Sequence, residues 1–277
     1  MNTEPDEQDF PPALEPSMPR KDRSFPALRV IVALILREMA TTYGRSPGGY
    51  LWAIVEPVGM IVVLSFGFSL LMRSPSLGHS FMLFYATGYL VFNHYSRIYG
   101  SVVNSINYSR PLLKYPAVTW IDSMIARLTL ALLTNLFNSF LIIGGTILVV
   151  GTSGVIDPVP VFLAFFLATM LGLGIGAMNS VLMGLFPIWR SLWNIAMGPL
   201  MIASAVIYIM EDLPDFAQNI LWWNPLTHIT GLSREGFFST YHPNYISEVY
   251  VLVIGTVFLV LGLIFLRANY LKILNFN

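Results

Sequence analysis

Six long apolar runs alternate with short polar segments along the chain. They cover residues 50–72, 81–103, 120–150, 159–185, 192–210 and 246–266. Each run can cross a bilayer, which needs about 20 apolar residues. The third and fourth runs exceed that length, so we expect them to tilt or to project beyond the lipid. The pattern predicts an all-α membrane protein with six transmembrane helices.

A shorter apolar pattern over residues 25–42 precedes the first run. Arg37 and Glu38 interrupt it, and inside a spanning helix each would cost about 2.5 kcal/mol or more. We therefore expect an N-terminal interfacial amphipathic helix, with a short first transmembrane helix as the alternative. Residues 1–24 are acidic and proline-rich, which predicts a disordered cytoplasmic tail before a membrane domain over residues 25–277.

The segment between the fifth and sixth runs, residues 211–243, is too polar to span a membrane. Pro214 indicates the start of one helix, and Asn224 with Pro225 is typical of an N-cap and first helical position. Two short amphipathic helices are predicted, over about 214–223 and 225–238. Because neither can cross a bilayer, we expect a re-entrant helical hairpin between spans five and six.

The composition supports a polytopic membrane protein, since 55% of the 277 residues are hydrophobic and only 11% are charged. The absence of cysteine excludes disulfides and thiolate chemistry. With the N-terminus inside, most Lys and Arg residues fall in cytoplasmic segments, as the positive-inside rule requires. Both termini are then expected in the cytoplasm, and the hairpin on the opposite side.

The second apolar run contains the main candidate for a binding surface. Asn93, Arg97 and Asn104 share one helix face, next to an aromatic face that includes Tyr89 and Phe92. Aromatic rings suit the C–H faces of sugars, and a cation near the inner boundary suits a phosphate. Packing against neighbouring helices is the alternative, because polar side chains at this depth must face protein or water.

The fourth run carries small residues at every fourth position, a spacing that lets other helices approach closely. They are Ala164, Ala168, Gly172, Gly176, Ser180 and Gly184. Four residues exceed one helical turn by about 40°, so the line winds around the helix. We therefore expect it to serve two neighbouring helices.

The segment 104–119, between the second and third runs, mixes two basic residues with an exposed-looking apolar pair, Leu112 and Leu113. It predicts a short cytoplasmic helix near Arg110–Tyr115 on which a partner docks, with lipid contact as the alternative.

No catalytic or nucleotide-binding motif is present in the sequence. The four histidines are scattered, and Gly-Lys, which a phosphate-binding loop requires, never occurs. Any ATP that powers this protein must therefore be bound by a separate subunit. Glu56 is the carboxylate that lies deepest inside a predicted span, and we expect it to cap or pair locally, next to Pro57.

Three segments carry a resemblance to a known family. They are YGRSPGGYLWAIVEP (Tyr43–Pro57), NYSRPLLKYPAVTWID (Asn107–Asp122) and NPLTHITGLSREGFF (Asn224–Phe238). In combination they resemble the permease subunits of type-2 ABC transporters, specifically the capsular polysaccharide exporters of Gram-negative bacteria. The resemblance covers most of the chain after Phe25.

The resemblance implies a homodimeric permease of the bacterial inner membrane, paired with two copies of a cytoplasmic ABC ATPase that bind ATP and Mg. A lipid-linked polysaccharide would pass between the two permease copies toward periplasmic and outer-membrane export proteins, and no nucleic-acid partner is expected. An O-antigen or teichoic-acid exporter and a drug-efflux permease remain alternatives within this fold. A lipid-linked glycan-processing intramembrane enzyme is the alternative from another class.

The candidate site residues follow from the residue patterns and the resemblance together. The substrate channel would be lined by Tyr50, Trp52, Tyr85, Tyr89, Phe92 and Arg97, and the anchor phosphate would be attracted by Arg37, Arg45 and Arg97. The ATPase would dock on Arg110, Leu112, Leu113, Lys114 and Tyr115. The periplasmic hairpin would use Trp222 and Trp223 at the membrane interface, Asn224 and Pro225 at a helix start, and Arg234 and Glu235 as polar contacts. A passive lid is the alternative role for the hairpin.

Overall fold

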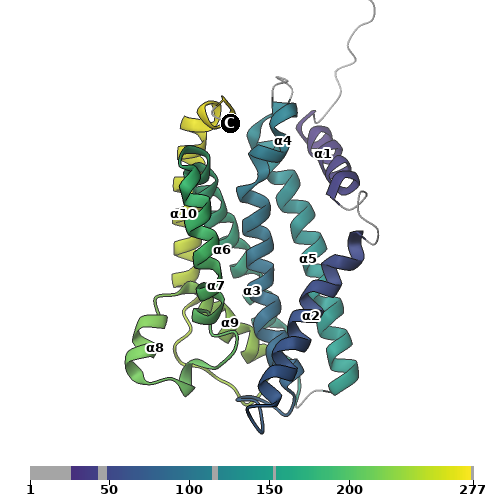
Figure 1. The fold of residues 1–277 in the computed structure, drawn as a ribbon, viewed down its shortest axis with the longest axis vertical. Helices are drawn as coiled ribbons and strands as arrows, with labels where there is room; N and C mark the ends of the chain where they lie inside the picture. The colour runs from purple at the N-terminus through teal and green to yellow at the C-terminus, as the bar shows by residue number, and fades with distance from the viewer. Residues whose placement is uncertain (1–25, 43–48, 114–117, 152–153, 276–277) are drawn as a thin grey trace, which may run out of the picture.

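The computed structural model describes residues 26–42, 49–113, 118–151 and 154–275, and it is all-helical over these residues (Figure 1). Its helices are α1 (Pro26–Thr42), α2 (Gly49–Ser69), α3 (Phe81–Val103), α4 (Ser105–Leu113), α5 (Trp120–Val150), α6 (Pro158–Leu185), α7 (Pro187–Ala203), the 3-10 turn η1 (Met210–Asp212), α8 (Asp215–Leu221), α9 (Pro225–Phe237) and α10 (Glu248–Asn275). The predicted all-α class is confirmed.

Four helices in the described residues are long and apolar enough to span a membrane, namely α2, α5, α6 and α10. Helix α3 has the length, with 23 residues, but it carries many polar and aromatic side chains. Helix α7 has only 17 residues. The six predicted runs therefore correspond to six helices, of which four meet the length and hydropathy expected of a span.

Helix α7 differs most from its predicted run, residues 192–210. It begins at Pro187, before the start of the predicted run. It therefore includes the exposed Arg190, which the apolar pattern had excluded. It ends at Ala203, because Ala205 adopts a left-handed φ of 55° that an α-helix cannot continue through. The apolar residues after Ala205 therefore form an irregular turn and do not continue the helix.

Helix α6 lies at the centre of the bundle and packs on both α3 and α10. A Cβ at Gly172 would lie 3.0 Å from the Tyr95 carbonyl of α3, and one at Gly184 would lie 2.7 Å from the Ile273 side chain of α10. The winding line of small residues thus serves two neighbours, as predicted. Close backbone approach explains why these positions exclude larger side chains.

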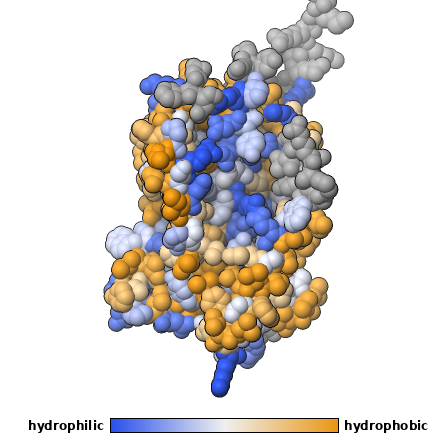
Figure 2. Space-filling model, in the orientation of Figure 1, coloured by the Kyte–Doolittle hydropathy of each residue, from blue (hydrophilic) through white to orange (hydrophobic). Residues whose placement is uncertain are grey.

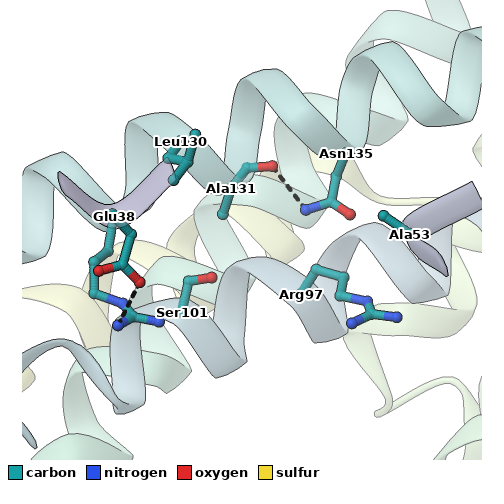
Figure 3. Close-up of a pocket in the computed structure, with 8 residues that line it drawn as sticks. Glu38, Ala53, Arg97, Ser101, Leu130, Ala131 and Asn135 are labelled. Carbon is teal, nitrogen blue, oxygen red and sulfur yellow. Dashed lines mark hydrogen bonds and ion pairs between the residues drawn. The ribbon is translucent and has the colours of Figure 1, made fainter. Parts of the chain in front are cut away.

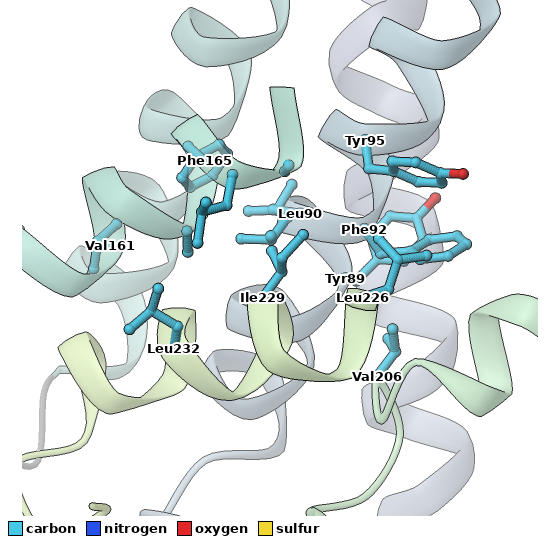
Figure 4. Close-up of a cluster of buried hydrophobic side chains, with 14 of the residues drawn as sticks. Tyr89, Leu90, Phe92, Tyr95, Val161, Phe165, Val206, Leu226, Ile229 and Leu232 are labelled. Atoms are coloured by element: carbon cyan, nitrogen blue, oxygen red, sulfur yellow. The ribbon is translucent and has the colours of Figure 1, made fainter. Parts of the chain in front are cut away.

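The predicted hairpin consists of two short helices, α8, which is mostly exposed, and α9, which is largely buried. In α9, Leu226, Ile229 and Leu232 point into a cluster that also contains Leu90 of α3 and Phe165 of α6 (Figure 4). Helix α8 has no buried residue. Asn224 caps α9 as predicted, because its side-chain oxygen accepts a hydrogen bond from the Leu226 amide at 3.1 Å.

The bundle has two distinct ends. Helices α1 and α4 lie at the same end as the C-terminus, and α8 lies at the other end (Figure 1). This arrangement separates the expected docking elements from the hairpin by the length of the bundle.

Candidate functional site

Hydrophilic side chains gather in a band on one face of the bundle, over the part nearer the C-terminal end (Figure 2). Three hollows lie along this polar groove. The first is lined by α1, α2, α3 and α5, and the second by α2, α3 and α7, both around the polar face of α3. The third lies where α4 meets the start of α7. The polar face predicted for the second apolar run is thus hollowed and solvent-accessible.

The first hollow is a cavity of about 160 Å³ between α1, α2, α3 and α5 (Figure 3). It is lined by Glu38, Ala53, Arg97, Ser101, Arg127, Leu130, Ala131 and Asn135. Arg97 and the Glu38 carboxylate lie toward opposite ends of it, with Ser101 between them (Figure 3).

One end of this cavity is formed by an ion pair between α1 and α5. The Arg127 guanidinium lies 2.9 Å from the Glu38 carboxylate, and both side chains are 13% exposed. The Tyr108 ring of α4 covers the same guanidinium, 4.1 Å from the ring centroid to Cζ. Arg127 therefore joins α1, α4 and α5 at the end of the bundle where α1 and α4 lie.

The other ion pair joins α2 and α3, because the Arg97 guanidinium donates a hydrogen bond to the Glu56 carboxylate. The prediction that Glu56 caps or pairs locally is wrong: its partner lies on the next long helix, 41 residues along the chain. Glu56 sits in the middle of α2, where the backbone amides are already used within the helix, so its side chain turns to α3.

The second hollow, of about 340 Å³, contains three of the predicted channel residues together: Tyr89, Phe92 and Arg97. Trp52 is exposed on α2, outside both hollows. Tyr85 lies apart from the groove, because its ring is buried between Phe68 and Phe84. The roles of Trp52 and Tyr85 in lining a path stay predictions.

Two of the predicted residues near the first span lie where the structure gives little or no side-chain detail. The side chain of Tyr50 and all of Arg45 are outside the described residues. Arg37 is exposed on α1 and does not line the cavity. Its assignment to the anchor phosphate therefore stays a prediction.

The third hollow, of about 370 Å³, lies beside α4 and the start of α7. Helix α4 begins at Ser105, earlier than the predicted Arg110–Tyr115, because its first turns pack on α5 through a Ser109–Ser123 hydrogen bond of 2.5 Å. Arg110 donates to the Ile273 carbonyl of α10 at 3.3 Å. Leu112 and Leu113 are half-buried, and Lys114 and Tyr115 lie outside the described residues.

At the opposite end, Arg234 of α9 is fully buried and closes the turn that ends α7. Its guanidinium donates to the carbonyls of Ala205 and Val206 at 2.7 Å each and of Tyr208 at 2.6 Å. Its Cζ lies 4.2 Å from the Phe84 ring centroid. Burial lowers the pKa of this guanidinium to about 10, so it remains charged at neutral pH.

The predicted tryptophans hold the α8–α9 corner to the start of α10. The Trp222 indole donates to the Tyr245 carbonyl at 3.1 Å, while Trp223 is exposed. His228 is buried, with Nε2 2.7 Å from the Trp222 carbonyl and Nδ1 accepting from the Ser247 amide at 3.2 Å. Burial lowers the pKa of His228, and these two bonds fit the neutral Nε2–H form.

Glu235, the remaining predicted hairpin contact, lies on the exposed side of α9. Its carboxylate is 3.7 Å from Nδ1 of the exposed His242. The two adjacent charges predicted as polar contacts therefore differ sharply, since Arg234 is internal and Glu235 lies at the surface.

Comparison with known proteins identifies the family. Residues 29–238 match the model of the ABC-2 type transporter family. The chain belongs to the ABC-2 type transporter membrane family. It is 30% identical to the polysialic acid transport protein KpsM of Escherichia coli, over 86% of this chain and 93% of that protein.

Two further relatives are named as capsule polysaccharide export proteins. The capsule polysaccharide export inner-membrane protein CtrC of Neisseria meningitidis is 28% identical, over 85% of this chain and 89% of its own length. The protein of the same description from Haemophilus influenzae, BexB, is 25% identical, over 86% and 90%. This ABC-2 chain is accordingly a transporter permease and not a glycan-processing enzyme, and its resemblance to the capsule exporter family is confirmed.

Sequence reasoning missed two features of this permease. The pairing of Glu38 with Arg127 had a signal, because both charges interrupt apolar patterns and each needs a partner. The burial of Arg234 and its three carbonyl partners had none, since an arginine in a polar segment between apolar runs is usually exposed.

Proposed function

We propose that this permease is the membrane subunit of an ATP-driven exporter that moves lipid-anchored capsular polysaccharide across the bacterial inner membrane. The observation that carries the proposal is its similarity, over 85–86% of its length, to one named polysialic acid transport protein and two named capsule polysaccharide export proteins. The groove lined by Tyr89, Phe92 and Arg97 supports a sugar substrate, because it offers aromatic faces beside a cation.

In this proposal six helices span the membrane: α2, α3, α5, α6, α7 and α10. Helix α3 is the polar member. Of its 23 residues 16 are buried, and its partly buried polar residues Asn93, Ser96, Arg97 and Ser101 line the hollows of the groove, as polar side chains at membrane depth must face protein or water. Helix α7, at 1.5 Å per residue, extends about 26 Å, slightly less than a bilayer core of roughly 30 Å. The turn clamped by Arg234 would complete its crossing.

The α8–α9 pair is proposed to be a re-entrant hairpin at the periplasmic mouth. Burial of α9 between α3 and α6 supports this placement, because backbone at membrane depth must be covered by protein. The exposed Phe216, Ile220 and Trp223 of the α8 segment would face the membrane interface. Both termini would then be cytoplasmic.

A second copy of the chain is proposed to close the polar groove into a channel. Helix α7 has no buried residue, and the groove beside it is open to solvent in a single copy. Two cytoplasmic ABC ATPase subunits, which bind ATP and Mg, would dock on α1 and α4. Periplasmic and outer-membrane export proteins would receive the polysaccharide.

Deleting the gene in its native host and measuring surface and intracellular polysaccharide would test this function. We expect surface polysaccharide to be lost and lipid-linked polysaccharide to accumulate in the cytoplasm. Expression of the wild-type chain should reverse both changes. Chemical analysis of the accumulated glycan would distinguish capsule from O-antigen. Normal surface polysaccharide in the deletion strain would refute the proposal.

A further inference from the structure

The two ion pairs beside the first cavity have a common arrangement. Both carboxylates, Glu38 and Glu56, come from the N-terminal helices α1 and α2, and both arginines come from α3 and α5. The pairs therefore fasten α1 and α2 to the wall made by α3 and α5. Arg97 and Arg127 also line the same cavity of about 160 Å³.

We propose that this cavity binds the phosphodiester of a membrane lipid, with Arg97 and Arg127 as its ligands. Glu38 and Glu56 hold the two guanidinium groups when the cavity is empty and release them to the phosphate when it is filled. The inference rests on the proposed function, because export of a lipid-anchored glycan needs a place for the phosphate of the anchor. It adds Arg127 and both carboxylates to that place.

The lining chemistry suits a phosphate. A guanidinium is a planar fork of donors that matches phosphate oxygens in pairs, and two arginines on different helices can approach the anion from two sides. Ser101, one turn after Arg97, offers a hydroxyl between Arg97 and the Glu38 carboxylate that pairs with Arg127 (Figure 3). The volume is many times the roughly 15 Å³ that one water molecule needs, so a polyatomic anion has room.

The depth of the cavity also suits a lipid headgroup. Arg127 lies seven residues inside the start of α5 and Arg97 six residues before the end of α3. At 1.5 Å per residue, both Cα atoms are roughly 10 Å from the helix ends that lie nearest α1 and α4. In the proposed orientation this is the boundary between headgroups and acyl chains of the inner leaflet. A phosphate can reach it there while its acyl chains stay in lipid.

A purely structural role for the ion pairs predicts a different response to mutation. If the pairs only hold helices together, Arg127→Gln and Glu38→Gln remove the same bond and have effects of the same sign. If the cavity binds phosphate, Arg127→Gln removes a ligand, whereas Glu38→Gln removes the carboxylate that competes with the anion. The two variants then act in opposite directions on lipid binding.

The experiment uses the complete permease–ATPase complex in phosphatidylcholine nanodiscs that contain a photoactivatable phosphatidylglycerol. Mass spectrometry measures the cross-linking of this probe to peptides from the cavity wall. We expect Arg127→Gln to lower the labelling about tenfold, the equivalent of one charge-assisted contact, and Glu38→Gln to raise it severalfold. Arg73→Gln, an exposed arginine outside the groove, is the matched control and should label like the wild type.

Competition distinguishes the two sources of a lipid phosphodiester. The probe is displaced either by lipid-linked polysaccharide extracted from the host or by unlabelled phosphatidylglycerol. If the polysaccharide displaces it at the lower concentration, the cavity is assigned to the exported anchor. The reverse order assigns it to a bilayer phospholipid. Either result supports the phosphate site.

Labelling that is unchanged in Arg127→Gln, or lowered equally in Arg127→Gln and Glu38→Gln, overturns the proposal. Melting temperatures of all variants ensure that only folded samples are compared. Export in cells tests the proposed function separately. If export requires the chain but cross-linking does not change in the arginine variants, only the cavity assignment fails. Normal export in the deletion strain refutes the proposed function itself.

Discussion

Replacing Arg234 by methionine should destabilise the permease strongly, although its position suggests a surface residue. Methionine keeps much of the side-chain volume but removes the donors to the carbonyls of Ala205, Val206 and Tyr208. A buried carbonyl without a partner costs about 1–3 kcal/mol, so the buried Ala205 and Val206 carbonyls together cost about 2–6 kcal/mol, and the part-buried Tyr208 carbonyl less, before the turn relaxes. The variant no longer buries a guanidinium charge, which offsets part of this cost. We therefore expect the free energy of unfolding to fall by about 3 kcal/mol, near the lower end of that range.

Thermal unfolding of the purified complex in detergent measures this loss. For a chain of this size, about 3 kcal/mol corresponds to a fall in Tm of roughly 6–10 °C. Glu235→Gln is the matched control, because the neighbouring side chain lies at the surface, 3.7 Å from the exposed His242, and should change stability by less than about 0.5 kcal/mol. A Tm for Arg234→Met within 1 °C of the wild type would refute the clamp.

Gly88 offers an independent check on the same geometry. A Cβ at Gly88 would lie 2.8 Å from Nη2 of Arg234 and 3.1 Å from the Val206 carbonyl oxygen, so Gly88→Ala should displace the guanidinium. In the Arg234→Met background the same substitution meets a more flexible neighbour and should cost less. The difference between the two costs is the coupling between the residues, and purely additive effects would contradict the proposed contact.

Three further predictions concern helix packing, pH and the groove. Gly262→Ala should lower Tm, because its Cβ would lie 2.7–2.8 Å from α6 backbone atoms, whereas Gly144→Ala, with open space around it, should be neutral or stabilising. Because burial lowers the pKa of His228, its contribution to stability is complete above about pH 6.5 and is lost as the pH falls toward the lowered value. His228→Gln should therefore flatten the decline of Tm below about pH 6.5. Tyr89→Ala should reduce export at normal protein level, and unchanged export would remove Tyr89 from the path.

Most of the helices could be predicted from the sequence because hydropathy and helix punctuation agree. The bounds of α3 and α5 match the predicted runs, and the Asn224–Pro225 start of α9 has the expected cap. The line of small residues on α6 also predicted that two helices pack closely on it, although not which two, since packing distance depends directly on side-chain size. These features are local or strictly periodic.

Long-range pairing of charges could not be predicted in the same way. Nothing near Glu56 indicates that its partner is Arg97, and nothing near Arg234 indicates three carbonyl acceptors from a turn nearly 30 residues earlier. Such contacts depend on how helices are rotated against one another, which periodicity leaves open. The end of α7 was missed for the same reason, because the turn at Ala205 is held from another part of the chain.

The distribution of burial indicates which helices around the polar groove can move. Helix α3 is buried along most of its length and is anchored near its N-terminal end, where Gly88 and Phe84 contact Arg234, so it forms a fixed wall. Helix α7 has no buried residue, and only 11% of the α2 span is buried. Elements with few buried contacts open at the lowest free energy. ATP-driven motion should therefore displace α2 and α7 relative to α3, and the Arg97–Glu56 pair, which joins moving and fixed walls, must break or stretch in every transport cycle.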